Sequence, residues 1–132
     1  MADVNIKINK AQIINFQPAD KTFQLIITYI EGIERKVGLN LNINDLNDSR
    51  GITEQIINSL KDSAQKRHST VDLDPDDPLA GYFSVNIEGE EVEEKMAFAL
   101  QNMKNKISNI ACQRNLPNFN ISEQVNKLEH KF

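Results

Sequence analysis

The sequence predicts an α+β fold, in which an antiparallel sheet of four to five strands packs with one long helix and two shorter helices. Two observations predict it: residues 4–43 have the pattern of three consecutive strands, and residues 90–115 have the spacing of one amphipathic helix. A chain of 132 residues is long enough for one domain to bury a core. We therefore expect a single α+β domain over residues 1–116 and a C-terminal helical extension over residues 117–132.

The first strand is predicted in two parts. Apolar and polar residues alternate from Val4 to Ile8, and the alternation resumes from Ile14 to Phe16. Residues 10–13 break the pattern, which indicates a β-bulge or a bend. Pro18 then begins a turn of four residues, because proline sets the backbone φ that such a turn needs. These features place the first two strands of a three-strand meander next to each other.

The middle strand, over residues 22–30, is apolar on both faces. Ile26 and Ile30 lie on one face, and the other face carries Phe23, Leu25, Ile27 and Tyr29. Such a strand has to be covered on both faces, either by this chain or by another subunit. Gly32 can supply the positive φ of a tight hairpin turn. The third strand follows, with one buried face formed by Val37, Leu39, Leu41 and Ile43.

One helix and two short strands are expected directly after the meander. The first helix has apolar residues at Ile52, Ile56, Ile57, Leu60 and Ala64. Residues 69–73 and 82–87 have strand chemistry and flank an acidic loop that contains two prolines. These two segments can pair as a hairpin or join the sheet separately, and the sequence leaves both arrangements open.

The long helix, over residues 90–115, has an apolar stripe and a charge distribution that suits the helix dipole. Its stripe consists of Val92, Met96, Ala99, Leu100, Met103, Ile107, Ile110 and Ala111. Phe98 lies off the stripe and indicates a second contact face, for the terminal helix or for a neighbouring subunit. Asn120 can cap a final helix with Glu123 three residues later. The stripe of that helix, Ile121, Val125, Leu128 and Phe132, can dock on its own chain or on a neighbour.

The acidic loop offers the best candidate metal ligands, namely Asp72, Asp74, Asp76 and Asp77. Carboxylate oxygens suit Ca²⁺ or Mg²⁺. The EF-hand pattern fails, however, because Asp77 stands where that loop needs glycine and Phe83 where it needs glutamate. A solvated acidic turn is the preferred interpretation, so these residues remain weak candidates and we predict no metal.

No catalytic arrangement is visible in the sequence. His68 and His130 have no metal-ligand neighbour three or four residues away, and no Gly-rich phosphate loop or nucleophile motif occurs. Cys112 is the single cysteine, and its place in a helix predicts a buried or half-buried, inert thiol. We therefore expect neither an enzyme nor a bound cofactor.

Charge and hydropathy restrict the partners. The net charge of −4 disfavours nucleic-acid binding, which depends on neutralising phosphates with lysine and arginine. The first residues lack a secretory signal, and no apolar run is long enough to span a bilayer. We expect protein partners, a homo-oligomer among them, no membrane, and a cytoplasmic location or incorporation into a particle assembled in the cytoplasm.

The long helical stripe and the middle strand, which is apolar on both faces, provide more apolar surface than one small sheet can bury. They predict a non-catalytic structural, assembly or protein-protein interaction module that self-associates. A small component of a phage-like particle or of another large complex fits this description. The alternative is a small-ligand-binding or regulatory module with a pocket between the sheet and the long helix. The predicted interaction residues are Ile26, Ile30, Phe98, Ile121, Val125, Leu128 and Phe132.

Overall fold

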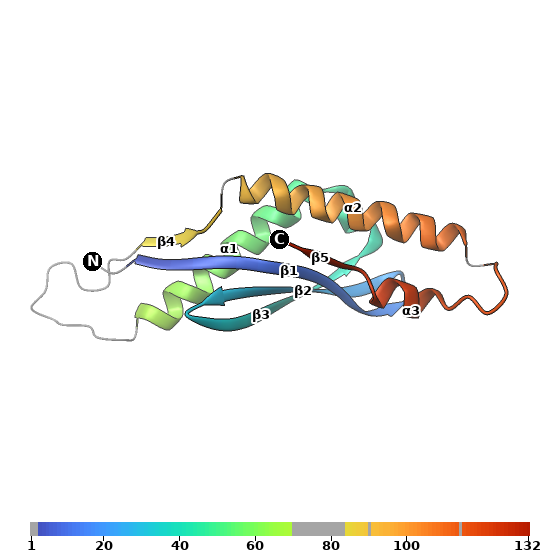
Figure 1. The fold of residues 1–132 in the computed structure, drawn as a ribbon, viewed down its shortest axis with the longest axis horizontal. Helices are drawn as coiled ribbons and strands as arrows, with labels where there is room; N and C mark the ends of the chain where they lie inside the picture. Colours follow the sequence, from blue (N-terminus) through green and yellow to red (C-terminus); the bar gives the residue numbers. More distant parts are fainter. Residues whose placement is uncertain (1–2, 70–83, 90, 114) are drawn as a thin grey trace, which may run out of the picture.

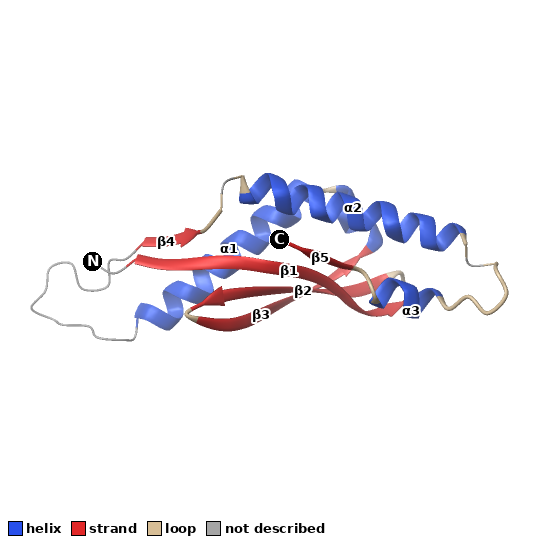
Figure 2. Ribbon diagram, viewed as in Figure 1, coloured by secondary structure: helices blue, strands red, loops and turns tan. Residues whose placement is uncertain are grey.

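The structure, a computed structural model, describes residues 3–69, 84–89, 91–113 and 115–132. Two long helices lie against one face of a twisted sheet, and a third, short helix sits at one end of the first strand (Figures 1 and 2). The elements in chain order are β1 (Asp3–Gln17), β2 (Thr22–Glu31), β3 (Ile33–Asn42), the 3-10 helix η1 (Ile43–Asn47), α1 (Ser49–Ser69), β4 (Ser84–Ile87), α2 (Val92–Cys112), α3 (Ile121–Asn126) and β5 (Glu129–Lys131).

The sheet has five strands, and the predicted N-terminal meander forms its centre. The strand order is β3-β2-β1-β4. β5 also pairs with β1, on the side of β1 that faces away from β2. The meander and β5 are antiparallel, whereas β4 pairs with β1 in parallel. These findings confirm the α+β fold. Of the two short strands predicted around the acidic loop, the second joins the sheet as β4. In the first, Ser69 belongs to α1, and residues 70–73 lie outside the described residues.

The predicted break in the first strand is a pair of bulges within one continuous strand. The pairing of β1 with β2 shifts between Ile8 and Lys10 and again between Ile14 and Gln17. Each bulge adds a residue and so changes which side chains face the core. Ile13, not Ile14, therefore lies in the core, where it is opposite Leu25.

The hairpin between β2 and β3 is as tight as the sequence predicts. Gly32 has a φ of +76° and separates Glu31 from Ile33, which pair with each other. The left-handed backbone conformation costs glycine nothing, because glycine has no Cβ. From this turn the ladder between β2 and β3 continues without a register shift up to the pair of Thr22 and Asn42.

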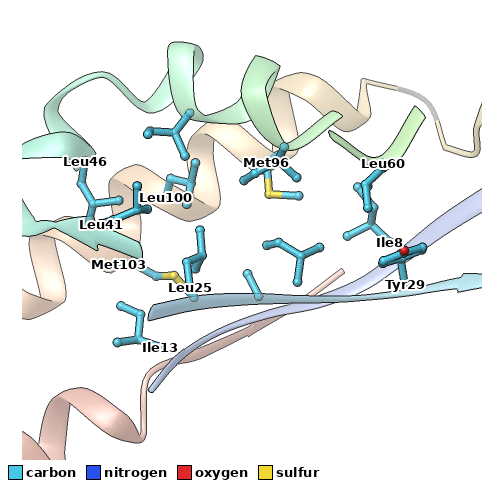
Figure 3. Packing of buried hydrophobic residues seen from close by; sticks show 14 of the residues in the cluster. Ile8, Ile13, Leu25, Tyr29, Leu41, Leu46, Leu60, Met96, Leu100 and Met103 are labelled. Carbon is cyan, nitrogen blue, oxygen red and sulfur yellow. The ribbon is translucent and has the colours of Figure 1, made fainter. Parts of the chain in front are cut away.

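The core fills the space between the sheet and the two long helices (Figure 3). Leu25 and Ile27 of β2 are fully buried there, and Met96 and Leu100 of α2 meet them from the helix layer. Both predicted helical stripes face this core, with Ile56, Leu60 and Ala64 of α1 completely buried. α1 and α2 have 21 residues each, so α1 is as long as α2. It continues beyond Ala64, the last residue of its predicted apolar stripe.

The C-terminal residues belong to the same core and sheet. Asn120 caps α3, because its side-chain oxygen accepts a hydrogen bond from the N–H of Glu123, as predicted. The final helix was expected to carry Phe132, but it ends at Asn126 and the chain continues as β5. The physical reason is the free edge of β1 beside Lys10–Gln12, whose main-chain groups β5 satisfies.

Candidate interaction surface

β3 lies at the outer end of the sheet and has only one strand neighbour. All ten of its residues pair with β2, and among the described residues no strand pairs with its other side. In Figure 1 it forms the lower rim of the sheet. An edge strand of this length exposes main-chain donors and acceptors to which another strand can bind.

The hydrogen bonds at the end of β3 show which of its main-chain groups point outward. The N–H of Ile43 donates to the carbonyl of Lys21, on the side of β2, whereas the N–H of Asn42 donates to a carboxylate oxygen of Asp45. Main-chain groups alternate between the two sides of an antiparallel strand. The outward-pointing groups therefore belong to the even-numbered residues, namely Glu34, Lys36, Gly38 and Asn40.

The apolar layer of the core extends to this edge without being closed there. Val37 and Leu39 of β3 lie opposite Ile27 and Leu25, which are fully buried. Val37 and Leu39 are only half-buried, although the sequence predicts them on a buried face. The core thus ends on side chains whose outer flanks remain open.

The outer face of the sheet carries two of the predicted interaction residues. Ile26 is half-buried and Ile30 is 38% exposed, and both point away from the helices. The sequence led us to expect a cover over this face as well. No helix or strand among the described residues lies over it, so Ile26 and Ile30 remain accessible in the single chain, although Thr28 between them is buried.

One glycine shapes that outer face at the edge. Gly38 lies opposite Ile26, and a Cβ on Gly38 would come within 3.1 Å of the Cδ1 atom of Ile26. The isoleucine side chain therefore extends over the glycine toward the rim of the sheet. Ile26 is in this way part of the edge as well as of the outer face.

A buried carboxylate fixes the hairpin at the start of this edge to the helix layer. Glu31 accepts two hydrogen bonds of 2.7 Å from Arg67 of α1, and the Nε of Arg35 in β3 lies 3.2 Å from its carboxylate. The hydrogen bond to Glu31 raises the pKa of Arg67, against the lowering effect of burial. Both arginines neutralise one carboxylate that is almost inaccessible, which is the condition for burying a charge.

Three further predicted interaction residues are used within the chain. Val125 of α3 is fully buried, and Ile121 and Leu128 pack against the core beside it. α3 and the residues that follow it make two hydrogen bonds to β1: the N–H of Phe16 donates to Asn126 Oδ1, and the N–H of Ile13 donates to the carbonyl of Leu128. In this chain, therefore, these apolar side chains have partners of their own.

Phe98 and Phe132 lie on a different part of the surface. Phe98 is 68% exposed on α2, and Phe132 is 38% exposed after β5. Phe98 lines an open hollow of about 860 Å³ between α1 and α2 and a second one of about 440 Å³ next to His130 and Phe132. The rings of His130 and Phe132 pack edge to face, with their centroids 4.9 Å apart.

The described residues include no candidate metal centre, and Cys112 is exposed. No group of three or more His, Cys, Asp or Glu residues among them is placed to hold a metal ion. The weak candidates Asp72, Asp74, Asp76 and Asp77 lie outside the described residues. The expected burial of Cys112 is wrong: the thiol is exposed, because the last turn of α2 extends beyond the buried stripe that ends near Ile107.

Sequence reasoning missed the edge residues Val37, Gly38 and Leu39. Their alternation predicts a strand with one buried face, but it does not reveal which strand lies at the end of the sheet. A usable signal is the absence of proline and charge in residues 37–42, since natural edge strands are often protected by such residues.

No helix among the described residues is long and apolar enough to cross a membrane. Comparisons of the chain with protein-family models, curated proteins and solved structures find no match.

Proposed function

We propose that this protein is a non-catalytic assembly module that associates with copies of itself, as one component of a larger complex. The observation that supports the proposal is the unprotected edge of β3. Over residues 37–42 this edge has no proline, no bulge and no charged side chain. An edge of this kind pairs readily with another strand, so a protein that retains it has a use for that pairing.

The side chains around the edge support the same proposal. Val37 and Leu39 have open flanks, Ile26 extends over Gly38, and Ile30 and Ile33 are exposed near the hairpin. Burying these apolar surfaces adds a favourable contribution to strand pairing. A phage-like particle is one setting in which such a small module would be used in many copies.

The alternative, a ligand-binding module, has less support. The space between the sheet and α2 is packed with buried side chains, among them Met96, Leu100 and Met103. The two hollows at Phe98 lie on the outer surface instead, and the larger one is lined mainly by polar and charged residues of α1 and α2.

Sedimentation velocity over a range of protein concentrations tests the proposal. We expect the average mass to rise above 15.0 kDa as the concentration increases. Leu39→Lys places a charge at the edge and should abolish this rise. Phe98→Lys, which makes the same kind of change at an exposed position on the other side of the molecule, should leave it intact. A strict monomer at every concentration would contradict the proposed function.

A further inference from the structure

We propose that the second copy pairs with β3 in antiparallel orientation, about a two-fold axis that passes between the two Gly38 residues. This inference rests on the proposed self-association and adds its geometry. The sheets of the two copies then form one continuous sheet in which β3 lies beside β3. The occupant of the edge is thus a second copy of this chain.

The symmetry restricts the possible registers. Two adjacent antiparallel strands of a closed dimer are related by a two-fold axis perpendicular to the sheet. This axis keeps each face on its own side, and residues directly opposite each other in an antiparallel pair point to the same face. Odd-numbered residues of β3 therefore oppose odd-numbered residues, and the helices of both copies cover the same face.

Centring the axis on Gly38 closes the open flanks of the core. Val37 of each copy then lies opposite Leu39 of the other, so that both half-buried side chains gain an apolar cross-strand neighbour. Leu41, which is already buried, gains less from pairing. A register centred on Leu39 would pair Val37 with Leu41 and leave fewer residues of the strand engaged.

The outer face fits the same register. The two Gly38 residues lie opposite each other and carry no side chains, and the Ile26 side chain of each copy extends over its own glycine. The two isoleucines therefore point toward each other across the glycine pair, with about 14 Å between their Cα atoms because three strand spacings separate them. No side chain at the centre of this register obstructs either isoleucine.

The charges of β3 also favour this register. Glu34, Arg35 and Lys36 come to lie opposite Asn42, Leu41 and Asn40, so that no like charges oppose each other. Registers centred on Arg35 or Lys36 would place that residue opposite its own copy, which is unfavourable. A register centred on Val37 avoids like charges but places Arg35, and not an apolar residue, opposite Leu39.

The size of the contact predicts how tight the dimer is. A strand of this length is about 30 Å long, and a sheet is about 10 Å thick, so the edge covers roughly 300 Å² per copy. A stable interface buries about 800 Å² per partner. We therefore expect a reversible dimer that forms as the concentration increases.

Disulfide trapping tests the register. In a Cys112→Ser background, chains with Lys36→Cys and chains with Asn40→Cys are mixed under mild oxidation at a concentration where the native protein is dimeric. Opposite residues in this register have Cα atoms about 5.5 Å apart, which suits a disulfide. We expect the mixture to form crosslinked dimers in several-fold excess over either variant alone.

Each outcome distinguishes the two proposals. Dimeric mass without an excess of crosslinks in the mixture would overturn the register and leave self-association intact. Equal crosslinking in the single-variant samples would likewise overturn it. A monomeric mass for both variants and for the native protein would overturn the proposed function itself.

Discussion

The two outer strands of the meander, β1 and β3, differ in what covers the side that faces away from β2. The edge of β1 is covered along its length: the N–H of Glu88 donates to Ile6, the N–H of Phe132 donates to Asn9, and β5 pairs with Lys10–Gln12. The strand itself has two bulges. The edge of β3 is regular, and no strand among the described residues covers it.

This difference indicates that the open edge is not a general feature of the fold. β5 pairs with β1 on one side of the sheet, and α3 beside it contributes Val125 to the core. At the other edge only Glu34, Arg35 and Lys36 offer the charged protection that is common on edge strands. The contrast supports our proposal that β3 pairs with a second copy of the chain.

The largest effect is expected from opening the covered edge. Val125→Ala removes a fully buried side chain from α3 and should lower the free energy of unfolding by about 1.5–3 kcal/mol. Chemical denaturation measures this loss. The amide of Ile13, which donates to Leu128, should also exchange faster. Leu116→Ala, at a mostly exposed position, is the matched control; an equal loss there would refute the role given to α3.

A smaller effect is expected at the buried carboxylate that fixes the open edge to α1. Glu31→Gln keeps the shape of the side chain and removes its charge, so that Arg67 and Arg35 lose their ionic partner. We expect a loss of about 1–2 kcal/mol in unfolding free energy, reduced by the partial exposure of both arginines. Glu34→Gln, at an exposed position nearby, should change stability by less than about 0.5 kcal/mol. Thermal and urea unfolding measure both losses. A larger loss for Glu34→Gln than for Glu31→Gln would contradict the role given to the buried carboxylate.

The turn that leads into the open edge should contribute less. Gly32→Ala introduces a Cβ at a φ of +76° with no neighbouring atom within 4 Å, so only backbone strain opposes it. We expect a loss of about 1 kcal/mol. Gly32→Asn should lose less, since asparagine tolerates this conformation better. Urea unfolding measures the three stabilities. Equal values for the native protein, Gly32→Ala and Gly32→Asn would contradict the need for glycine in this turn.

The smallest effect is expected on the far side of the molecule. Phe98 is exposed, so Phe98→Ala should change the unfolding free energy by no more than about 0.5 kcal/mol. It should also leave the dimerisation constant unchanged, because Phe98 lies on α2 and not at the edge of β3. A weakened dimer in sedimentation experiments would move the interface toward the hollows at Phe98.

Local patterns predicted much of this fold. The meander, the Gly32 turn, both long helical stripes and the Asn120 cap follow from residues close together in sequence. These features depend on period and turn chemistry, which a single sequence records directly.

Features that depend on distant parts of the chain were not predictable. The exposure of Cys112 depends on how far the core extends along α2. The parallel pairing of β4 with β1 and the strand β5 depend on which main-chain edges other elements leave free. For the same reason Ile26 was predicted as an interaction residue, whereas its neighbour Gly38 was not. The edge position of β3 is a property of the assembled sheet.

Amide hydrogen exchange along β3, at low and at high protein concentration, tests the central proposal most directly. The amides of Arg35, Val37 and Leu39 point toward β2 and should be protected at both concentrations. We predict that those of Lys36, Gly38 and Asn40 exchange quickly in dilute solution and become protected as the dimer forms. Fast exchange of these three amides at every concentration would contradict pairing through this edge.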